Sequence, residues 1–541
     1  MIRLIRKHWP IIIVMGIYLV TMIVLLILSV NKNQGRLIYP VDDTYIHMAI
    51  AKNAVLYNVW GVTRYEFTSS TSSPLYTFLI AITYKVFGVN EYAPLLLNLL
   101  FGILTIIFSY YFLKKYITSQ LRIFISLFIT VFVMPLPSLT FLGMEHILQS
   151  LLSLCFIYVF IKTFSKAEIW NRKQYLYLMI LSPLVTTIRY EGIFLVFIVC
   201  ILLLIQKRVF YAMAIGFTGL LPIVLYGFWS MAHGWYFFPN SVLLKGLLPK
   251  FSPGGLFDSA GGNSLKNIYE SRIILLMVIA SLFMLLLSNI RKEKLSEGIK
   301  YANLILIGII FFHMQYALTG WFFRYEAYLL LIGFIVISIS IDGLLPKNYF
   351  REIFSQKLPH YAALILIIII FAYPYFNRGI NSLWITPQAT NNIYEQQYQM
   401  GTFLRDYYKG KTILVNDIGA VTYLADIRLI DLCGLGSMET AKLKRNNLFN
   451  MQQINNLSQN RDAATAIVYD EMLQTISGSP QRWKRMGQWE ITNNVICASN
   501  KVSLYAISPI SEEKLKQNLK QFAVKLPSDI KQSGDYTVTG N

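Results

Sequence analysis

The chain has 541 residues, of which 55% are hydrophobic and only 14% are charged. Soluble domains have about 45–50% apolar and about 25% charged residues, so this composition excludes an ordinary soluble protein and indicates lipid as the main solvent. The formal net charge of +20 does not require a nucleic-acid partner, because the lysines and arginines gather in short stretches between apolar runs, as in membrane proteins.

The first long apolar run covers residues 11–30 and contains no charged residue. A helix of about 20 apolar residues can cross a hydrocarbon core of roughly 30 Å. Arg3, Arg6 and Lys7 precede the run, and no small-residue cleavage site follows it. We therefore expect a retained first membrane span rather than a cleaved signal peptide.

The residues after this span predict a short helix that begins beside two acidic residues, Asp42 and Asp43. Apolar residues recur there at helical spacing, which predicts an amphipathic helix on the membrane surface. They are Ile46, Ala49, Ile50, Ala54 and Tyr57. One aspartate could simply cap the helix, a role that Asp fills well. Alternatively, one is a general base that takes a proton from an acceptor hydroxyl.

Ten further spans are predicted. Their number can be tested, because the basic clusters between them should all fall on one side of the membrane. The spans are 93–113, 121–134, 147–163, 174–188, 192–206, 209–232, 272–290, 301–319, 323–342 and 359–376. Residues 74–88 look like another span, but counting them would invert every later loop and break the charge rule. With Lys85 inside it, this segment is better interpreted as an interfacial or re-entrant helix. The N-terminus is then cytoplasmic, and everything after residue 376 lies outside.

Ionisable residues recur on the loops of the outer face. Arg189, Lys245 and Arg324 lie at or beside the outer ends of spans. Acidic residues accompany them, namely Asp42, Asp43, Glu145, Glu191 and Glu326. Ionisable groups at membrane depth are costly, so clusters of them are functional candidates. They could pair with one another or reach the lipid headgroups, but their recurrence on nearly every outer loop favours a shared outer cavity.

The composition turns polar from about residue 377, which indicates a C-terminal domain outside the membrane. Short apolar stretches at 412–417, 428–432 and 465–470 predict buried strands. A helix is predicted from Ser511, followed by a loose tail. The predicted fold is therefore a polytopic α-helical membrane protein with about 11 spans in residues 1–376 and a small α/β domain in residues 377–541.

Four C-terminal residues could carry chemistry of their own. Asp417 and Asp431 each follow a predicted strand, and they either bind a ligand or cap and turn the chain. Cys433 and Cys497 could form a disulfide. The sequence contains no HExxH motif and no Cys/His cluster with metal-ligand spacing, and it leaves open whether Asp42 and Asp43 hold a divalent metal ion.

The order of the outer motifs resembles a known family. The acidic pair, the surface helix and the stretch TSSTSSPLYTFLIA are followed by GMEH, RYEG, PNSVLLK, FFRYE and NDIGAVTYLADIRLIDLCGLG. Over roughly residues 1–440, this order resembles the GT-C superfamily of integral-membrane glycosyltransferases. Within it, the nearest likeness is to arabinofuranosyltransferases and to dolichyl- or polyprenyl-phosphate-mannose-dependent mannosyltransferases.

The resemblance implies transfer of one sugar from a polyprenyl-phosphate donor, with inversion at the anomeric carbon. Asp42 would be the general base, and Asp43 would orient it, the acceptor or a metal ion. Lys245, Arg324 and Arg189 would contact the donor phosphate and stabilise the leaving group. Arg189 could instead pair with Glu191. The further substrate-binding candidates are Glu145, His146, Glu191, Asn240 and Tyr325.

The same resemblance implies the partners and the location of the protein. The acceptor would be a cell-envelope glycan, a lipid or a protein on the outer side of a bacterial inner membrane, with the C-terminal domain in the periplasm. No nucleotide-binding loop is present, and the donor phosphate is already an activated leaving group.

The rival classes are a transporter or flippase, and a non-catalytic assembly protein for envelope polysaccharide. The former normally places ionisable groups near mid-span, where they are scarce here.

Overall fold

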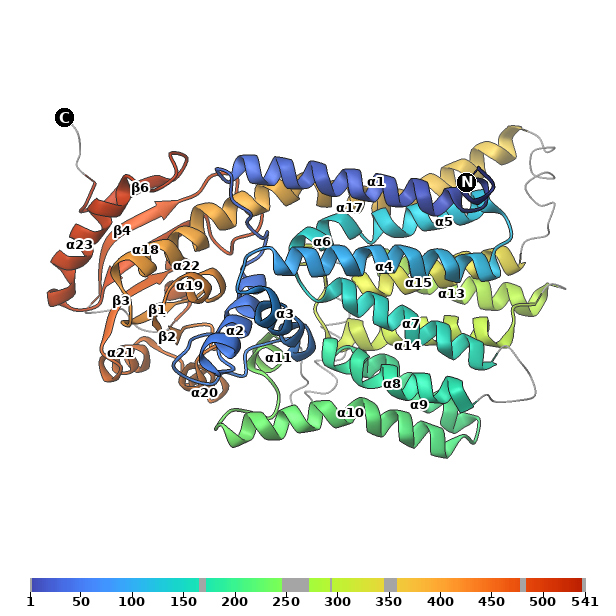
Figure 1. The fold of residues 1–541 in the computed structure, drawn as a ribbon, viewed down its shortest axis with the longest axis horizontal. Helices are drawn as coiled ribbons and strands as arrows, with labels where there is room; N and C mark the ends of the chain where they lie inside the picture. Colours follow the sequence, from blue (N-terminus) through green and yellow to red (C-terminus); the bar gives the residue numbers. More distant parts are fainter. Residues whose placement is uncertain are drawn as a thin grey trace. The chain divides into compact units, whose positions relative to one another are not determined.

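The computed structural model describes residues 2–164, 172–245, 272–291, 294–344, 358–476 and 483–537. The chain divides into two compact units, whose elements are labelled in Figure 1. Unit 1 comprises residues 1–24, 95–225 and 246–384, and unit 2 comprises residues 25–94, 226–245 and 385–541. The domain boundary predicted between residues 376 and 377 stays a prediction, and helix α17 (Leu358–Ile393) runs across it.

Long apolar helices make up unit 1. They are α1 (Ile2–Lys32), α4 (Ala93–Tyr116), α5 (Gln120–Val133), α6 (Leu136–Leu142), α7 (His146–Phe164), α8 (Arg172–Ile188), α9 (Gly192–Ile205), α10 (Val209–Ala232), α13 (Arg272–Ile290), α14 (Glu297–Tyr316), α15 (Ala327–Leu344) and most of α17. Each of the eleven predicted spans lies on one or more of these helices. Among the described residues, eight helices are long and apolar enough to cross a membrane.

The helices of unit 1 differ in how far they are enclosed. Helices α7, α14 and α15 pack against one another, and α15 is buried along most of its length. Helices α10 and α13 instead expose large apolar side chains, such as Phe210 and Ile290. An exposed apolar surface of this kind is stable in lipid but not in water. The protein is therefore a multi-pass membrane protein, as its composition predicts.

Unit 2 combines short helices with one sheet. The helices are α2 (Asp43–Tyr57), α3 (Pro74–Phe87), α11 (Asn240–Lys245), the π-helix η1 (Tyr394–Tyr398), α18 (Gln399–Tyr407), α19 (Gly419–Leu424), α20 (Met438–Arg445), α21 (Met451–Asn460), α22 (Asp470–Thr475) and α23 (Pro509–Ala523). The strands are β1 (Thr412–Val415), β2 (Arg428–Asp431), β3 (Ala463–Val468), β4 (Lys484–Glu490), β5 (Lys501–Ala506) and β6 (Lys531–Gly534).

The six strands form one mixed sheet in the order β2-β1-β3-β5-β4-β6. Strands β2, β1 and β3 are parallel, and they are the three predicted strands. The remaining pairings are antiparallel. Trp489 of β4 is buried against Phe403 and Phe522, which fixes α18 and α23 on the sheet. A C-terminal α/β domain is thus confirmed.

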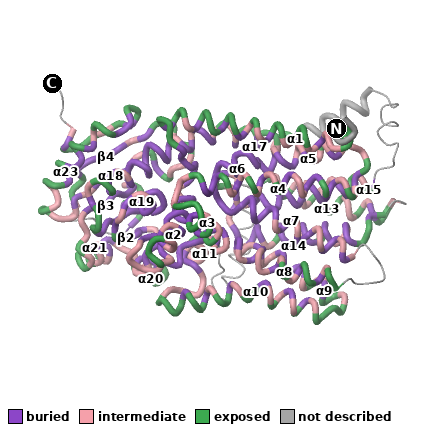
Figure 2. The backbone as a smooth tube through the Cα atoms, viewed as in Figure 1, coloured by how far each residue is buried: buried purple, intermediate pink, exposed green. Residues whose placement is uncertain are grey.

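The first-loop helix α2 differs from a simple surface helix. The predicted apolar residues of its first half are buried, but so are Thr44, His47 and Asn53, which point to its other sides. In Figure 2 most of α2 is coloured as buried. The reason is that α2 packs against both α3 and α19, so that protein covers the sides that the sequence pattern assigned to water.

Candidate functional site

The carboxylate of Asp42 is fixed by the backbone of helix α19. Its two oxygens accept hydrogen bonds from the amides of Gly419 (2.7 Å) and Ala420 (2.8 Å). Its side chain makes no capping bond to α2, although Asp42 directly precedes that helix. A Cβ at Gly419 would lie 2.0 Å from the backbone oxygen of Asp42, so only glycine permits this approach. Asp42 therefore occupies the N-cap position of α2, but its carboxylate binds α19 instead of capping α2.

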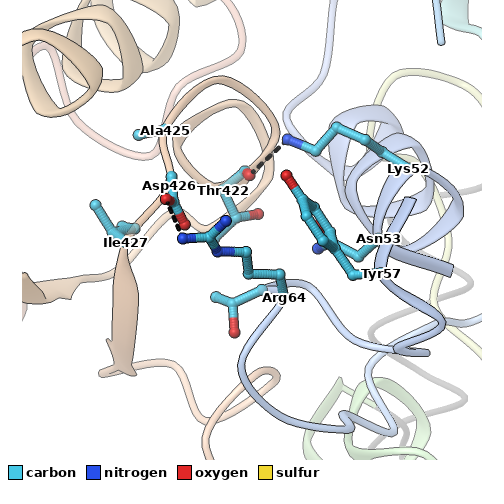
Figure 3. Close-up of a pocket in the computed structure, with 9 residues that line it drawn as sticks. Lys52, Asn53, Tyr57, Arg64, Thr422, Ala425, Asp426 and Ile427 are labelled. Carbon is cyan, nitrogen blue, oxygen red and sulfur yellow. Dashed lines mark hydrogen bonds and ion pairs between the residues drawn. The ribbon is translucent and has the colours of Figure 1, made fainter. Parts of the chain in front are cut away.

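Lys52 holds the other end of the same contact between α2 and α19. Its ammonium lies 3.5 Å from the carbonyl oxygen of Thr422 and also donates to the carbonyl of Tyr423, as Figure 3 shows for Thr422. Helix α19 thus has a carboxylate at its N-terminus and an ammonium at its C-terminus, the arrangement that the helix dipole favours. Both contacts fix the register of α2, and with it the position of Asp42.

Asp43 forms an ion pair with Lys245. The ammonium lies 3.2 Å from Oδ1 of Asp43, and both side chains are partly exposed. Lys245 ends helix α11, and Asn240 begins it. Asn240 is buried and anchors α11 with two hydrogen bonds. Its backbone amide donates to the carbonyl of Ser69, and its side-chain amide donates to the carbonyl of Gly434. The predicted residues Asp43, Lys245 and Asn240 are therefore brought together.

A second carboxylate, Asp417, lies in a buried polar network. It accepts hydrogen bonds from the hydroxyl of Tyr469 and from Nε2 of Gln397 (2.7 Å). Gln397 belongs to the π-helix η1, and such helices are frequent at functional sites. The Sγ atom of Cys497 lies 3.5 Å from Oε1 of Gln397. Neither Gln397 nor Tyr469 was predicted, because their side chains meet Asp417 only through the tertiary fold.

The two carboxylates affect one another. Burial raises the pKa of Asp42 to about 7, with the negative charge of Asp417 as the next cause, while the amides of Ala420 and Gly419 oppose the rise. Burial likewise raises the pKa of Asp417. A carboxyl group with a pKa near neutrality is suited to accept a proton and release it again.

Asp431 has a structural role. Its oxygens accept the backbone amides of Cys433 and Gly436, both at 2.7 Å, and its side chain is fully buried. Burial raises its pKa to about 6. This side chain turns the chain after β2, which is one of its two predicted roles. Cys433 and Cys497 are free thiols in the structure.

The residues around Asp42 do not fit a bound metal ion. In the parts of the chain that the structure describes, no group of three or more His, Cys, Asp or Glu residues could hold one. Both oxygens of Asp42 face N–H donors, and Asp43 faces an ammonium.

Unit 1 contains a separate set of ionisable residues around Arg189. This side chain pairs with Glu191 through two nitrogens (2.6 and 3.1 Å) and with Glu145 (2.7 Å). The same guanidinium contacts Nε2 of His146 at 3.0 Å. The predicted alternative, a pair between Arg189 and Glu191, is present, and the prediction that Arg189 contacts phosphate stays untested.

The ring of Tyr325 contacts both predicted cations of unit 1. Its ring lies 5.4 Å from the guanidinium of Arg189 and 4.9 Å from that of Arg324, distances typical of cation–π contacts. Arg324 is almost fully buried, and it donates to the sulfur of Met144 and to the hydroxyl of Tyr325. Glu145, His146, Arg189, Arg324 and Tyr325 therefore form one cluster, and the shared outer cavity stays a prediction.

A strained turn presents Arg324 and Tyr325. Trp321, Phe322 and Phe323 have φ angles of +36°, +59° and +60°, a left-handed conformation that costs roughly 1–2 kcal/mol per L-residue. The turn is held by Glu326, which accepts from the amide of Gly320 at 3.0 Å and pairs with Arg378 at 2.6 Å.

Arg378 also donates to the carbonyl of Phe323 at 2.7 Å, so it closes the turn from a second side. It was not predicted because it follows the last predicted span. Such outliers persist only where the surroundings hold them, and they are frequent at functional sites.

The bundle of membrane helices, the helices between the first two spans and the C-terminal α/β sheet together form a fold that is also found in solved structures. Two of these structures are of ArnT, a GT-C glycosyltransferase, from Cupriavidus metallidurans, one bound to undecaprenyl phosphate and one in the apo state. Each is 12% identical to the chain, with a TM-score of 0.54. The superpositions cover 93% and 94% of this chain and 98% and 99% of the ArnT chains.

Sequence comparison adds one local match. A domain of unknown function (DUF8728) matches residues 391–505, which include η1, Asp417 and strands β1 to β5. No curated protein matches the chain by sequence. The likeness to the ArnT structures therefore shows the fold of the chain.

Proposed function

We propose that this protein is a glycosyltransferase that moves one sugar from a polyprenyl-phosphate donor to an envelope glycan, lipid or protein, with Asp42 as the general base. Arabinofuranose and mannose are the candidate sugars, because the motif order resembles enzymes that transfer them. The observation that carries the proposal is the half-buried carboxylate of Asp42, which two backbone amides hold in a chain with the GT-C fold.

Asp42 would remove one proton from the acceptor hydroxyl. As the acceptor oxygen attacks the anomeric carbon, its proton passes to Asp42, the bond from that carbon to the phosphate oxygen breaks, and polyprenyl phosphate leaves. Attack opposite the leaving group inverts the anomeric configuration. The amides of Gly419 and Ala420 occupy one lone pair on each carboxylate oxygen, and a second lone pair on each can still accept a proton.

Lys245 is the proposed contact to the donor phosphate in unit 2. Its ammonium is partly exposed, so a phosphate oxygen can reach it while Asp43 holds it in place. Positive charge beside the leaving oxygen stabilises the charge that develops as the bond breaks. For Arg324 and Arg189 in unit 1, the same role stays a prediction that requires its own variants.

The proposed location follows from the charge pattern of the loops. The N-terminus would face the cytoplasm of a bacterium, and residues 377–541 would lie outside the inner membrane. The resemblance favours transfer on that outer side. A cysteine at position 529, in place of an exposed aspartate, should then react with a membrane-impermeant maleimide in intact spheroplasts.

The direct test of the function is the lipid content of a deletion strain. Without the enzyme, the polyprenyl-phosphate sugar should accumulate, and mass spectrometry of the lipid extract gives the mass of the sugar. Expression of the wild-type protein should remove the accumulated lipid, whereas Asp42→Asn expressed at the same level should not. An unchanged lipid profile in the deletion strain would contradict the proposal.

A further inference from the structure

A cavity of unit 2 lies where the three parallel strands begin. Its volume is about 320 Å³, which is at the lower end of the range for small-ligand sites. Thr412 is the first residue of β1, Arg428 is the first residue of β2, and Arg461 shortly precedes β3. Tyr65 and Glu66, from the loop before α3, complete the lining.

This cavity is separate from the surroundings of Asp42. Asp417 and the amides that hold Asp42 follow the end of β1, whereas the cavity is lined by its first residue. The four residues of β1 span about 13 Å at roughly 3.3 Å per residue. Ligands of open α/β sheets normally bind at the ends of the strands rather than at their beginnings, so this cavity needs an explanation of its own.

Arg428 is held in place by an aromatic ring. Its guanidinium lies 4.4 Å from the ring centroid of Tyr65. The hydroxyl of Tyr65 donates to Asp426 at 3.0 Å, and Asp426 pairs with Arg64 at 2.7 Å, as Figure 3 shows. Within the described residues, no carboxylate lies within ion-pair distance of Arg428. Its N–H groups are therefore available to a ligand.

The second arginine of the cavity is bound differently. Arg461 pairs with Glu439 and lies 3.5 Å from Glu66, so its charge is matched within the protein. It fixes the carboxylate of Glu66 at the wall, where Glu66 can accept hydrogen bonds from hydroxyl groups. The cavity thus combines a planar cation, Arg428, that has no ion-pair partner among the described residues with a carboxylate acceptor, Glu66.

We propose that this cavity binds an anionic sugar unit, one that carries a carboxylate or a phosphate, as a distal part of the acceptor glycan. The identification of the ligand as part of the acceptor rests on the proposed function, whereas the binding of an anionic sugar does not. Arg428 would hold the oxyanion, because a guanidinium matches two oxygens of a carboxylate or phosphate at once. Glu66 would accept hydroxyl groups of the same sugar unit.

The test is calorimetric binding to the full-length protein in detergent, with glucuronic acid, glucose 6-phosphate, glucose and inorganic phosphate as separate probes. The two acidic sugars should bind, and Arg428→Ala should weaken them about tenfold or more, because a charge-assisted pair is lost. Arg428→Lys should give an intermediate affinity. The matched control is Arg445→Ala, since Arg445 stacks on Tyr236 at 4.3 Å outside the cavity and should leave binding unchanged.

Three results would overturn the inference. They are equal affinity in Arg428→Ala and the wild type, binding of glucose as tight as that of glucose 6-phosphate, and binding of inorganic phosphate as tight as that of glucose 6-phosphate. Asp42→Asn should bind the acidic sugars normally. If the wild-type protein binds the acidic sugars but has no transferase activity, the proposed function is refuted and the cavity assignment stands, and activity of the wild type without binding would do the reverse.

Discussion

The ionisable residues of unit 1 and those around Asp42 in unit 2 have their charges balanced in different ways. In unit 1, Glu145 and Glu191 pair with Arg189, and Glu326 pairs with Arg378, at distances of 2.6–2.7 Å. In unit 2, uncharged donors bind the carboxylates of Asp42 and Asp417. The negative charge of Asp417 also raises the pKa of Asp42.

This difference separates two roles that look the same in the sequence. A carboxylate that faces an arginine stays ionised and holds structure together. A carboxylate that faces amides and another carboxylate has a raised pKa, and it can exchange a proton near neutral pH. We therefore propose that proton transfer takes place in unit 2 and that the glutamates of unit 1 mainly support the structure.

The largest expected effect is that of Asp42→Asn on transfer. Loss of a general base typically lowers the rate by about 100- to 10,000-fold. The initial rate of sugar transfer by the purified, folded protein should fall in this range. Asp406→Asn is the matched control, because Asp406 pairs with Lys525 on the surface of unit 2 and should keep full activity. If Asp42→Asn kept more than about half of the wild-type rate, Asp42 would not be the general base.

Glu326→Gln should affect stability rather than proton transfer. Removal of one partner from a buried ion pair typically costs about 3–5 kcal/mol, and here it would leave Arg378 buried beside a strained turn. The melting temperature in detergent should fall clearly. Glu297→Gln serves as the control in the same unit, since Glu297 is exposed and pairs only with nearby Lys300 among the described residues. Equal melting temperatures for both variants would contradict the structural role of Glu326.

Lys245→Ala should weaken the donor interaction. Loss of one partly exposed charge contact to phosphate is expected to raise the KM for the donor about tenfold, because such a bond contributes about 1.5–3 kcal/mol at most. Lys245→Arg should restore most of the affinity, and Lys520→Ala on the exposed side of α23 should change nothing. If the KM of Lys245→Ala equals that of the wild type, the contact lies elsewhere.

The smallest effect is a shift in the pH profile. Activity should rise with pH as Asp42 loses its proton, with a midpoint near its pKa of about 7. Asp417→Asn removes a negative charge that raises this pKa, so the midpoint should move to lower pH. Profiles of kcat/KM for the variant and for the surface control Asp529→Asn measure the shift. A midpoint that stays in place or moves to higher pH would show that Asp417 does not act on Asp42.

Much of the fold follows from the sequence, because long apolar runs have few alternatives to membrane helices. The three parallel strands were also predictable, since each is a short apolar run. Strand β4 was missed because its sequence, KRMGQWE, is polar and contains an irregularity between Arg485 and Gly487. Strand β6 reads KQSG and contains no apolar residue.

The candidate site was only partly predictable. The positions of Asp42, Asp43 and Lys245 follow from charge and loop pattern. The partner of Asp42 is an amide 377 residues further along the chain, and backbone amides leave no signal in a sequence. The left-handed turn before Arg324 was equally hidden, because bulky residues such as Trp321 and Phe322 normally avoid positive φ.

The central claim is the transfer of one sugar from a polyprenyl monophosphate, and the products of a single reaction test it most directly. Membranes that contain the wild-type protein would be mixed with the lipid extract of the deletion strain and an extract of envelope acceptors. Mass spectrometry should show free polyprenyl monophosphate and an acceptor heavier by the same sugar mass, with neither product in membranes that contain Asp42→Asn. Unchanged donor lipid in the wild-type reaction, or equal product with the variant, would contradict the account.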